Sequence, residues 1–251
     1  MTEQTLLSQL TRLPRPSDDA AAERGLETFL SSAAQVPEHH NEALAAAEDP
    51  QNAALLRAIF GNSPYLTQTI IRDLPYFLGL LHRAPETALR EILDELTYRT
   101  ETPPPTRADT MRLLRRNKAR AALLIAIADI GNIWPLETIT GALSEVAEAS
   151  IAHAVNALLA EAARKGDFAL ALPDQPGAQS GYTVIAMGKL GAGELNFSSD
   201  IDLIPLFDPE VAQYTGKKSV QDAFVRLTQG LVQILQERTA DGYVYRTDLR
   251  L

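Results

Sequence analysis

Two aspartates, Asp200 and Asp202, lie two residues apart in an apolar segment with the composition of a β-strand. Side chains two positions apart in a strand share a face and lie about 7 Å apart, so these carboxylates are predicted to project together. Ile204 and Leu206 are expected to continue this face into the core. Two close carboxylates repel each other unless a cation joins them, and Mg²⁺ prefers carboxylate oxygens together with phosphates. The spacing therefore predicts a divalent-metal site.

Asp248 is the predicted third carboxylate of this site. It lies in residues 242–251, which alternate like a strand, and a β-α-β order lets that strand join the sheet containing Asp200. Three converging carboxylates can hold two metal ions about 3.5 to 4 Å apart, the usual clamp for in-line displacement at phosphorus. Asp200, Asp202 and Asp248 are therefore predicted to be both the metal ligands and the catalytic residues.

A glycine-rich turn precedes the two aspartates. Gly188 follows an apolar run directly, and such a turn lets backbone N–H groups approach an anion closely. Lys189 adds a positive charge, and Ser198 and Ser199 can donate hydroxyl groups to phosphate oxygens. These groups are predicted to bind a phosphate and to stabilise the charge that develops during its transfer.

Each of these motifs has an ordinary explanation when taken alone. A glycine turn is usually only a turn, and this one is not a P-loop because Leu190 stands where that motif needs Ser or Thr. Asp-x-Asp is common, and an EF-hand is excluded because Ile204 occupies a position that needs an oxygen ligand. The combination of strand, glycine turn, Asp-x-Asp strand, helix and further Asp strand is typical of a DNA polymerase β-type nucleotidyltransferase palm.

The elements that must position these residues divide the chain by composition. Residues 1–170 are rich in Ala, Leu, Glu and Arg, and prolines and glycines break them into segments of helical length. The predicted helices cover about residues 3–12, 18–34, 51–60, 64–72, 86–98, 107–130 and 136–165. Pro37 and Pro75 are among the prolines interpreted as helix stops. The apolar stripe of the last of these helices is expected to serve packing.

After residue 170 the pattern changes. The stretch 172–181 is polar and dense in Pro and Gly, so it predicts a linker. Strands are then expected at 182–187, 200–207 and 242–251, with an amphipathic helix at 220–238. The predicted fold class is α+β, with an all-helical region over 1–170 and a nucleotidyltransferase palm with a mixed β-sheet over 171–251.

Composition limits the possible environments and partners. The 251 residues, 45% of them hydrophobic, suffice for a globular core, and the absence of cysteine excludes disulfides and thiolate metal sites. No run approaches the roughly 20 apolar residues that cross a bilayer, and no signal peptide is recognisable, so a cytoplasmic protein without a membrane partner is predicted. The net charge of -9 argues against a nucleic-acid partner.

One local exception to the acidic balance is the segment 107–120, which holds six basic residues and one acid. It is interpreted either as a docking surface for an acidic partner or for phosphates, or as a solvated helix face that pairs with local acids. The second interpretation is favoured.

The chain from Gly188 to Ile204 also resembles one family in particular. Its string GKLGAGELNFSSDIDLI is similar to the signature of the glutamine synthetase adenylyltransferase and adenylyl-removing enzymes, and residues 61–66 and 113–130 look like that family's helical region. The resemblance covers about residues 55–251. It implies two nucleotidyltransferase units in tandem. The amino-terminal unit removes AMP from a tyrosine of glutamine synthetase by phosphorolysis and releases ADP, whereas the carboxy-terminal unit adds AMP from ATP.

The resemblance also implies roles for individual residues. The three aspartates would hold Mg²⁺, as two ions, and Gly188, Lys189 and Ser199 would belong to the phosphate-binding loop. Arg246 and Arg250 share the strand face of Asp248, where they either orient the attacking phosphate or are paired strand-end charges. The implied partner is glutamine synthetase, with a PII-type signalling protein acting through regions absent here.

Because the motif follows about 180 mostly helical residues, the chain resembles the amino-terminal, removing unit. The family continues beyond Asp248, whereas this sequence stops three residues later, so the chain is expected to be a fragment with a truncated palm. Two alternatives remain. One is a catalytically inert, protein-binding helical module. The other is a nucleotidyltransferase that acts on RNA or small molecules, against which the charge and the signature weigh.

Overall fold

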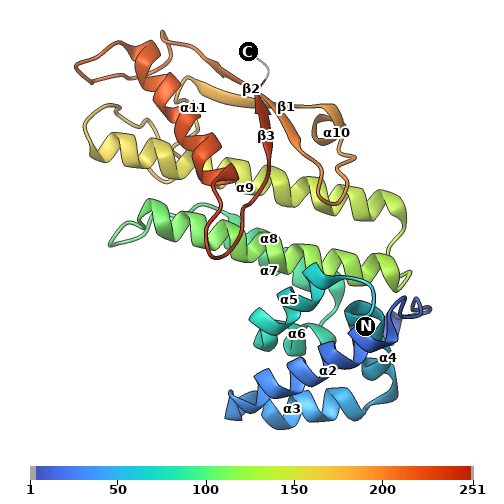
Figure 1. Cartoon of the computed structure of the whole chain (residues 1–251). Coiled ribbons are helices and arrows are strands. Elements are labelled where there is room, and N and C mark those ends of the chain that lie inside the picture. The colour runs from blue at the N-terminus through green and yellow to red at the C-terminus, as the bar shows by residue number, and fades with distance from the viewer. Residues whose placement is uncertain (1–3, 250–251) are drawn as a thin grey trace. The chain divides into compact units, whose positions relative to one another are not determined.

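A computed structural model of the chain describes residues 4–249. These residues form two compact units, each of which is described by itself (Figure 1). The first unit comprises the residues up to Glu91 together with Ala119–Ile139, and the second comprises Ile92–Lys118 together with the residues from Thr140 onward. The helices and the small mixed sheet confirm the predicted α+β class. The domain boundary predicted near residue 170 remains a prediction.

The first unit is helical. Its own helices are α1 (Leu6–Gln9), α2 (Asp19–Ala34), α3 (Pro37–Glu48), α4 (Pro50–Phe60), α5 (Pro64–Arg72) and α6 (Leu74–Leu81). Three further helices contribute residues to both units: α7 (Pro85–Leu96), α8 (Arg107–Ile130) and α9 (Leu136–Arg164). In the core of the first unit Phe29 contacts Phe60 and Phe77, with ring centroids 6.2 and 6.1 Å apart. Within the described residues, no helix has both the length and the apolar character needed to cross a membrane.

Helices α3 and α6 have no counterpart among the predicted helices. Pro37 and Pro75, expected to stop helices, lie in the first turn of α3 and α6. Proline is tolerated there because its missing N–H has no partner within the helix and its fixed φ suits the first turn. The helices predicted at 18–34, 51–60, 64–72, 107–130 and 136–165 agree with α2, α4, α5, α8 and α9 to within one residue at each end.

The second unit contains the sheet. Its strands are β1 (Tyr182–Met187), β2 (Ile201–Phe207) and β3 (Thr247–Leu249), in the order β1-β2-β3. β1 pairs with β2 antiparallel, and β2 pairs with β3 in parallel. The crossover between β2 and β3 contains α11 (Val220–Gln236), which confirms the predicted β-α-β order. β3 begins at Thr247, five residues later than the strand predicted over 242–251, and residues 250–251 of that prediction lie outside the described residues.

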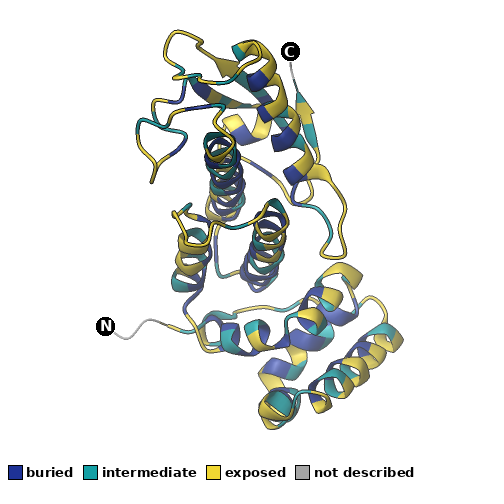
Figure 2. Ribbon diagram, turned by 90° about the vertical axis from the view of Figure 1, so that its left-hand side faces the viewer, coloured by how far each residue is buried: buried dark blue, intermediate teal, exposed yellow. Residues whose placement is uncertain are grey.

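Helix α11 covers one face of this sheet. Its Phe224 stacks on Tyr182 of β1 and on Phe207 of β2, with ring centroids 5.7 and 4.8 Å apart. Ile201 and Leu203 of β2 face the same side and are completely buried. Figure 2 shows the matching division of α11 into a buried and an exposed stripe. Because side chains alternate along a strand, the other face of the sheet, which carries Asp202, lies toward solvent.

The expectation that Ile204 and Leu206 enter the core is therefore wrong. Both have the same parity as Asp202, so they lie on the open face, where Leu206 is 45% exposed and Ile204 is half-buried. The core residues of β2 are Ile201 and Leu203, which alternate with Asp202 and Ile204 along the strand.

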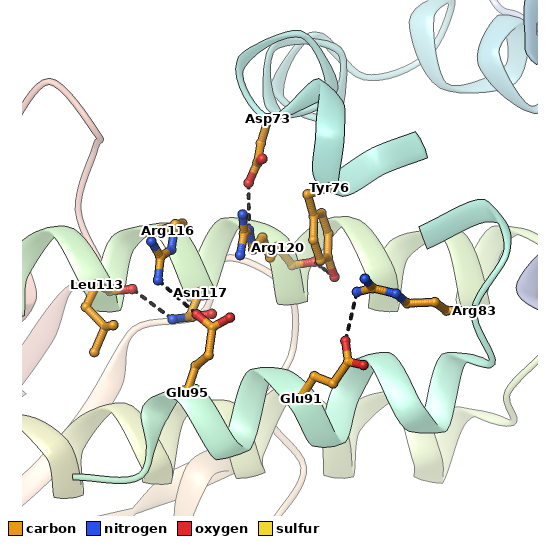
Figure 3. A network of polar contacts seen from close by, with 9 residues as sticks. All are labelled: Asp73, Tyr76, Arg83, Glu91, Glu95, Leu113, Arg116, Asn117 and Arg120. Atoms are coloured by element: carbon orange, nitrogen blue, oxygen red, sulfur yellow. Dashed lines mark hydrogen bonds and ion pairs between the residues drawn. The ribbon is translucent and has the colours of Figure 1, made fainter. Parts of the chain in front are cut away.

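The basic segment 107–120 is paired within the chain. The partners are Glu161 for Arg107, Asp109 for Arg112, backbone carbonyls for Arg115, Glu95 for Arg116, the ring of Tyr243 for Lys118, and Asp73 for Arg120. Figure 3 shows two of these ion pairs, Arg116 with Glu95 in the second unit and Arg120 with Asp73 in the first. These pairs support the interpretation of the segment as a structural helix face.

His153 is buried in the second unit and only 8% exposed. Its Nδ1 lies 3.0 Å from the carbonyl oxygen of Leu96, so this nitrogen must carry the donated proton. Burial lowers the pKa of His153, against a smaller opposing effect of the hydrogen bond to Leu96. The folded chain therefore binds a proton at this site less readily than the unfolded chain does.

We expect this histidine to weaken the fold at mildly acidic pH. The unfolded chain takes up a proton near a pKa of about 6.5, so the free energy of unfolding falls below that pH by up to about 1.4 kcal/mol per pH unit. Above about pH 7 both states are neutral and the contribution vanishes. Urea unfolding between pH 5 and 8 gives the free energy of unfolding at each pH. This free energy should depend less on pH in His153→Gln than in the parent chain. His82→Gln, which alters an exposed histidine, is the control. An equal change in the pH dependence of the unfolding free energy in both variants would contradict the role of His153.

Candidate active site

The three strands bring two of the predicted aspartates to the same position in the sheet. Asp202 of β2 pairs in register with Asp248 of β3, and on its other side it pairs with Met187 of β1. Residues in register on adjacent strands point to the same face, so both carboxylates lie on the open side of the sheet, away from α11. Asp202 is half-buried and Asp248 is exposed.

Asp200, one residue before β2, lies opposite Arg246 when the same register is extended. Its carboxylate accepts a hydrogen bond from Arg246 Nε. Arg246 also donates through Nη2 to the carbonyl of Ser198 at 2.8 Å and through Nη1 to the hydroxyl of Tyr243 at 3.3 Å. The hydrogen bond and the charge of Asp200 raise the pKa of Arg246. Of the two interpretations of Arg246, the structure has the paired charge.

The glycine turn lies against the carboxylate of Asp202. Gly188 has a φ of +57°, and a Cβ atom at this position would lie 2.8 Å from Asp202 Oδ2. A side chain here would therefore be strained by the backbone and would crowd the carboxylate. The turn itself is one helical turn, α10 (Gly188–Gly191), in which Lys189 is exposed.

The rest of the loop, residues 192–200, is anchored on α9. The backbone N–H of the buried Leu195 donates to Ser144 Oγ at 3.1 Å, and Ser144 Oγ donates in turn to the carbonyl of Thr140 at 2.8 Å. Ser198 has a φ of +57°, and Ser199 donates its N–H to the carbonyl of Asn196 at 3.2 Å. The loop thus holds both predicted serines next to Asp200.

Ser144 and Tyr243 were not identified from the sequence. Ser144 resembles any serine that bonds the preceding turn of a helix, and Tyr243 lies outside every motif, so neither carries a local signal. Arg250, predicted to bind phosphate, lies outside the described residues.

The predicted metal site is tested by the arrangement of its donors. Over residues 4–249, no three acidic or histidine side chains converge closely enough to hold a metal ion. Asp202 and Asp248 supply carboxylate oxygens of the kind that Mg²⁺ prefers, on the side of the sheet that Gly188 keeps open. Asp200 is directed to Arg246 instead. Two of the three predicted donors therefore share a register position on the open face, and the third would have to leave Arg246 to join them.

A mixed sheet with a β-α-β crossover, two carboxylates in register on its open face and a glycine turn beside them belongs to the nucleotidyltransferase class of palm. Residues 53–251 match the family described as glutamate-ammonia ligase adenylyltransferase. This match covers well over half of the chain, and the chain therefore belongs to that family.

Curated relatives agree with the family. The chain is 40% identical over 248 residues to a protein of Bradyrhizobium diazoefficiens named bifunctional glutamine synthetase adenylyltransferase/adenylyl-removing enzyme, covering 99% of the chain and 25% of the relative. Proteins of the same name from Bradyrhizobium sp. strain ORS 278 and Xanthobacter autotrophicus are 47% and 38% identical, covering 79% and 100% of the chain and 20% and 23% of the relatives. The chain thus spans about a quarter of the length of these relatives.

Two glycines of the loop offer a matched test of the Gly188 contact. Gly188 and Gly193 both have positive φ, but a Cβ atom on Gly193 would meet nothing within 4 Å. We expect alanine to cost about 1 to 2 kcal/mol of unfolding free energy at either position, because each is left-handed. Only Gly188→Ala should displace the Asp202 carboxylate and weaken Mg²⁺ binding in a calorimetric titration. Equal Mg²⁺ affinities for the two alanine variants would count against a metal site at Asp202.

Proposed function

We propose that this chain is the part of a glutamine synthetase adenylyltransferase and adenylyl-removing enzyme that removes AMP from adenylylated glutamine synthetase by phosphorolysis. One observation carries the proposal: Asp202 and Asp248 share a register position on the open face of the sheet, beside Gly188. The names of the relatives support glutamine synthetase as the protein substrate. The removing direction rests on the resemblance to the amino-terminal unit, and the addition of AMP from ATP is the competing direction.

In the proposed reaction an oxygen of inorganic phosphate forms a bond to the phosphorus of the AMP group. The bond from that phosphorus to the tyrosine oxygen breaks, the tyrosine oxygen takes up a proton, and ADP is released. Negative charge is spread over the oxygens around phosphorus, so catalysis consists mainly of positioning and of charge stabilisation.

The residues on the open face have complementary roles in this proposal. Asp202 and Asp248 hold Mg²⁺, with a second ion if Asp200 joins them. When bound, Mg²⁺ neutralises charge on the phosphate oxygens and supports the leaving oxygen. Lys189, together with Ser198 and Ser199 of the anchored loop, contacts the phosphates. Contact of Arg250 with phosphate remains a prediction, as do the cytoplasmic location and a PII-type partner.

The test is phosphate-dependent release of ADP from adenylylated glutamine synthetase, measured with the chain alone and with the chain extended to the length of its relatives. Replacing Asp202 or Asp248 by Asn should lower the rate about 100-fold or more, the scale of losing one group that stabilises transition-state charge. Asp208→Asn is the matched control, because Asp208 follows the far end of β2 and its carboxylate accepts a hydrogen bond from Glu210 N, at 2.9 Å.

The outcomes separate the competing interpretations. Undiminished ADP release by Asp202→Asn and Asp248→Asn would reject the site. Transfer of AMP from ATP without any phosphate-dependent removal would reverse the direction. Binding of glutamine synthetase that persists in both variants, without turnover by any form of the protein, would favour the inert helical binding module.

A further inference from the structure

Arg115 of α8 is a buried charge in the second unit. Its side chain is among the largest that are fully enclosed, with only 1% of the residue exposed. Burial lowers the pKa of its guanidinium group, and the charges of Glu237 and Asp241 partly oppose this effect. Removing a cation from water is costly unless hydrogen bonds replace the lost hydration, so the partners of Arg115 indicate what this residue is for.

The guanidinium group of Arg115 donates to three backbone carbonyls. Nη1 donates to the carbonyl of Met111 one turn earlier in α8, at 2.9 Å. Nε donates to the carbonyl of Gly242 at 2.9 Å, and Nη2 donates to the carbonyl of Glu237. Glu237 and Gly242 bound a turn, residues 237–242, which is the first part of the connection from α11 to β3. One planar guanidinium group thus holds both ends of this turn against α8.

The turn continues directly into the candidate site. Tyr243 follows Gly242, and its hydroxyl accepts a hydrogen bond from Arg246, which in turn holds Asp200. The N–H groups of Val244 and Tyr245 both donate to the carbonyl of Leu235, at 2.9 and 3.0 Å, which ties the same segment to the end of α11. β3 begins at Thr247, one residue after Arg246.

We propose that Arg115 is a positioning residue, whose fork to the carbonyls of Glu237 and Gly242 fixes β3 on β2 and thereby places Asp248 beside Asp202. Its consequence for catalysis rests on the proposed function, whereas its effect on the β2–β3 pairing does not. The turn sets where the chain enters β3 at Thr247, and therefore which residue of β3 lies opposite Asp202.

The geometry requires arginine at this position. The guanidinium group presents several N–H donors in one plane, so it reaches carbonyls on α8 and at both ends of the turn together. An ammonium group is a compact point charge on a flexible stem and cannot span the same three acceptors. Arg115→Lys therefore keeps the charge but loses the fork.

Arg116 is a natural control. It follows Arg115 on the same helix, but its Nη2 makes a surface ion pair with Glu95 at 2.9 Å, and the two side chains are 48% and 42% exposed. Its replacement removes a cation from α8 without touching the turn. Arg116→Met and Arg115→Met therefore differ only in the site of the lost group.

The experiment is amide hydrogen exchange combined with kinetics, for Arg115→Lys, Arg115→Met and Arg116→Met. The N–H of Ile201 donates to the carbonyl of Arg246 at 3.0 Å, so its exchange rate reports the β2–β3 pairing. We expect this amide to exchange about tenfold faster or more in both Arg115 variants, while the amides in the middle of α11 change little. In the extended protein kcat for ADP release should fall with an unchanged KM for adenylylated glutamine synthetase. Arg116→Met should match the parent in both measurements.

Each outcome decides a different point. The positioning role would be overturned if the Ile201 amide exchanged at the parent rate in both Arg115 variants. It would also be overturned if exchange throughout α11 rose as much as exchange at Ile201. If Arg115→Met does not fold, Arg115→Lys and its exchange rates carry the test. Absence of ADP release from the unaltered extended protein would reject the proposed function, and the exchange rates would still judge the positioning of β3.

Discussion

The parallel pairing of β3 with β2 is the constraint on which the candidate site depends. It sets Asp248 beside Asp202 and extends to the pair formed by Asp200 and Arg246. The connection from α11 contributes to this register, because it sets where the chain enters β3 at Thr247. That connection is held by hydrogen bonds to the carbonyl of Leu235 and from the side chain of Arg115. Residues of α11 and α8 thus determine how the carboxylates on the open face are placed.

The same packing decides which side of the sheet is available for chemistry. Phe224 of α11 covers the face that contains Ile201 and Leu203, so the residues of opposite parity are left toward solvent. The open face combines carboxylates with apolar side chains, since Ile185 and Leu206 remain 44% and 45% exposed there. A charged group and an apolar surface therefore lie next to each other on one side of the sheet.

Local pattern predicts the parts of this structure that depend on local rules. The bounds of β1 and the β-α-β order follow from alternation, from turn residues and from helical period. The error at Ile204 and Leu206 has a clear origin. Apolar character suggested the core, although residues two apart share the face of Asp202 and must follow it toward solvent. Pro37 and Pro75 follow the ends of α2 and α5 as predicted, but each also lies in the first turn of a helix that was not predicted, because proline suits that position.

Contacts between distant segments follow from no such rule. Leu195 meets Ser144, 51 positions earlier, and Arg115 meets Gly242, 127 positions later, and neither pairing has a signature in its neighbouring residues. The same holds for Arg246 and Asp200, 46 positions apart. In the sequence Arg246 was open to two interpretations, because a cation near a phosphate site and a cation paired with an aspartate look identical until the strands are placed.

The pair formed by Asp200 and Arg246 gives this last contact a consequence for the proposed reaction. Both side chains are at least half exposed, at 57% and 50%, and exposed ion pairs are weak and screened by salt. If Asp202 and Asp248 hold a divalent cation, as proposed, its double charge would attract the Asp200 carboxylate more strongly than one guanidinium group does. Transfer of Asp200 to the cation would release Arg246 on the strand face of Asp248, where an incoming phosphate needs a positive charge. The two interpretations of Arg246 would then describe one residue before and after the metal ion binds.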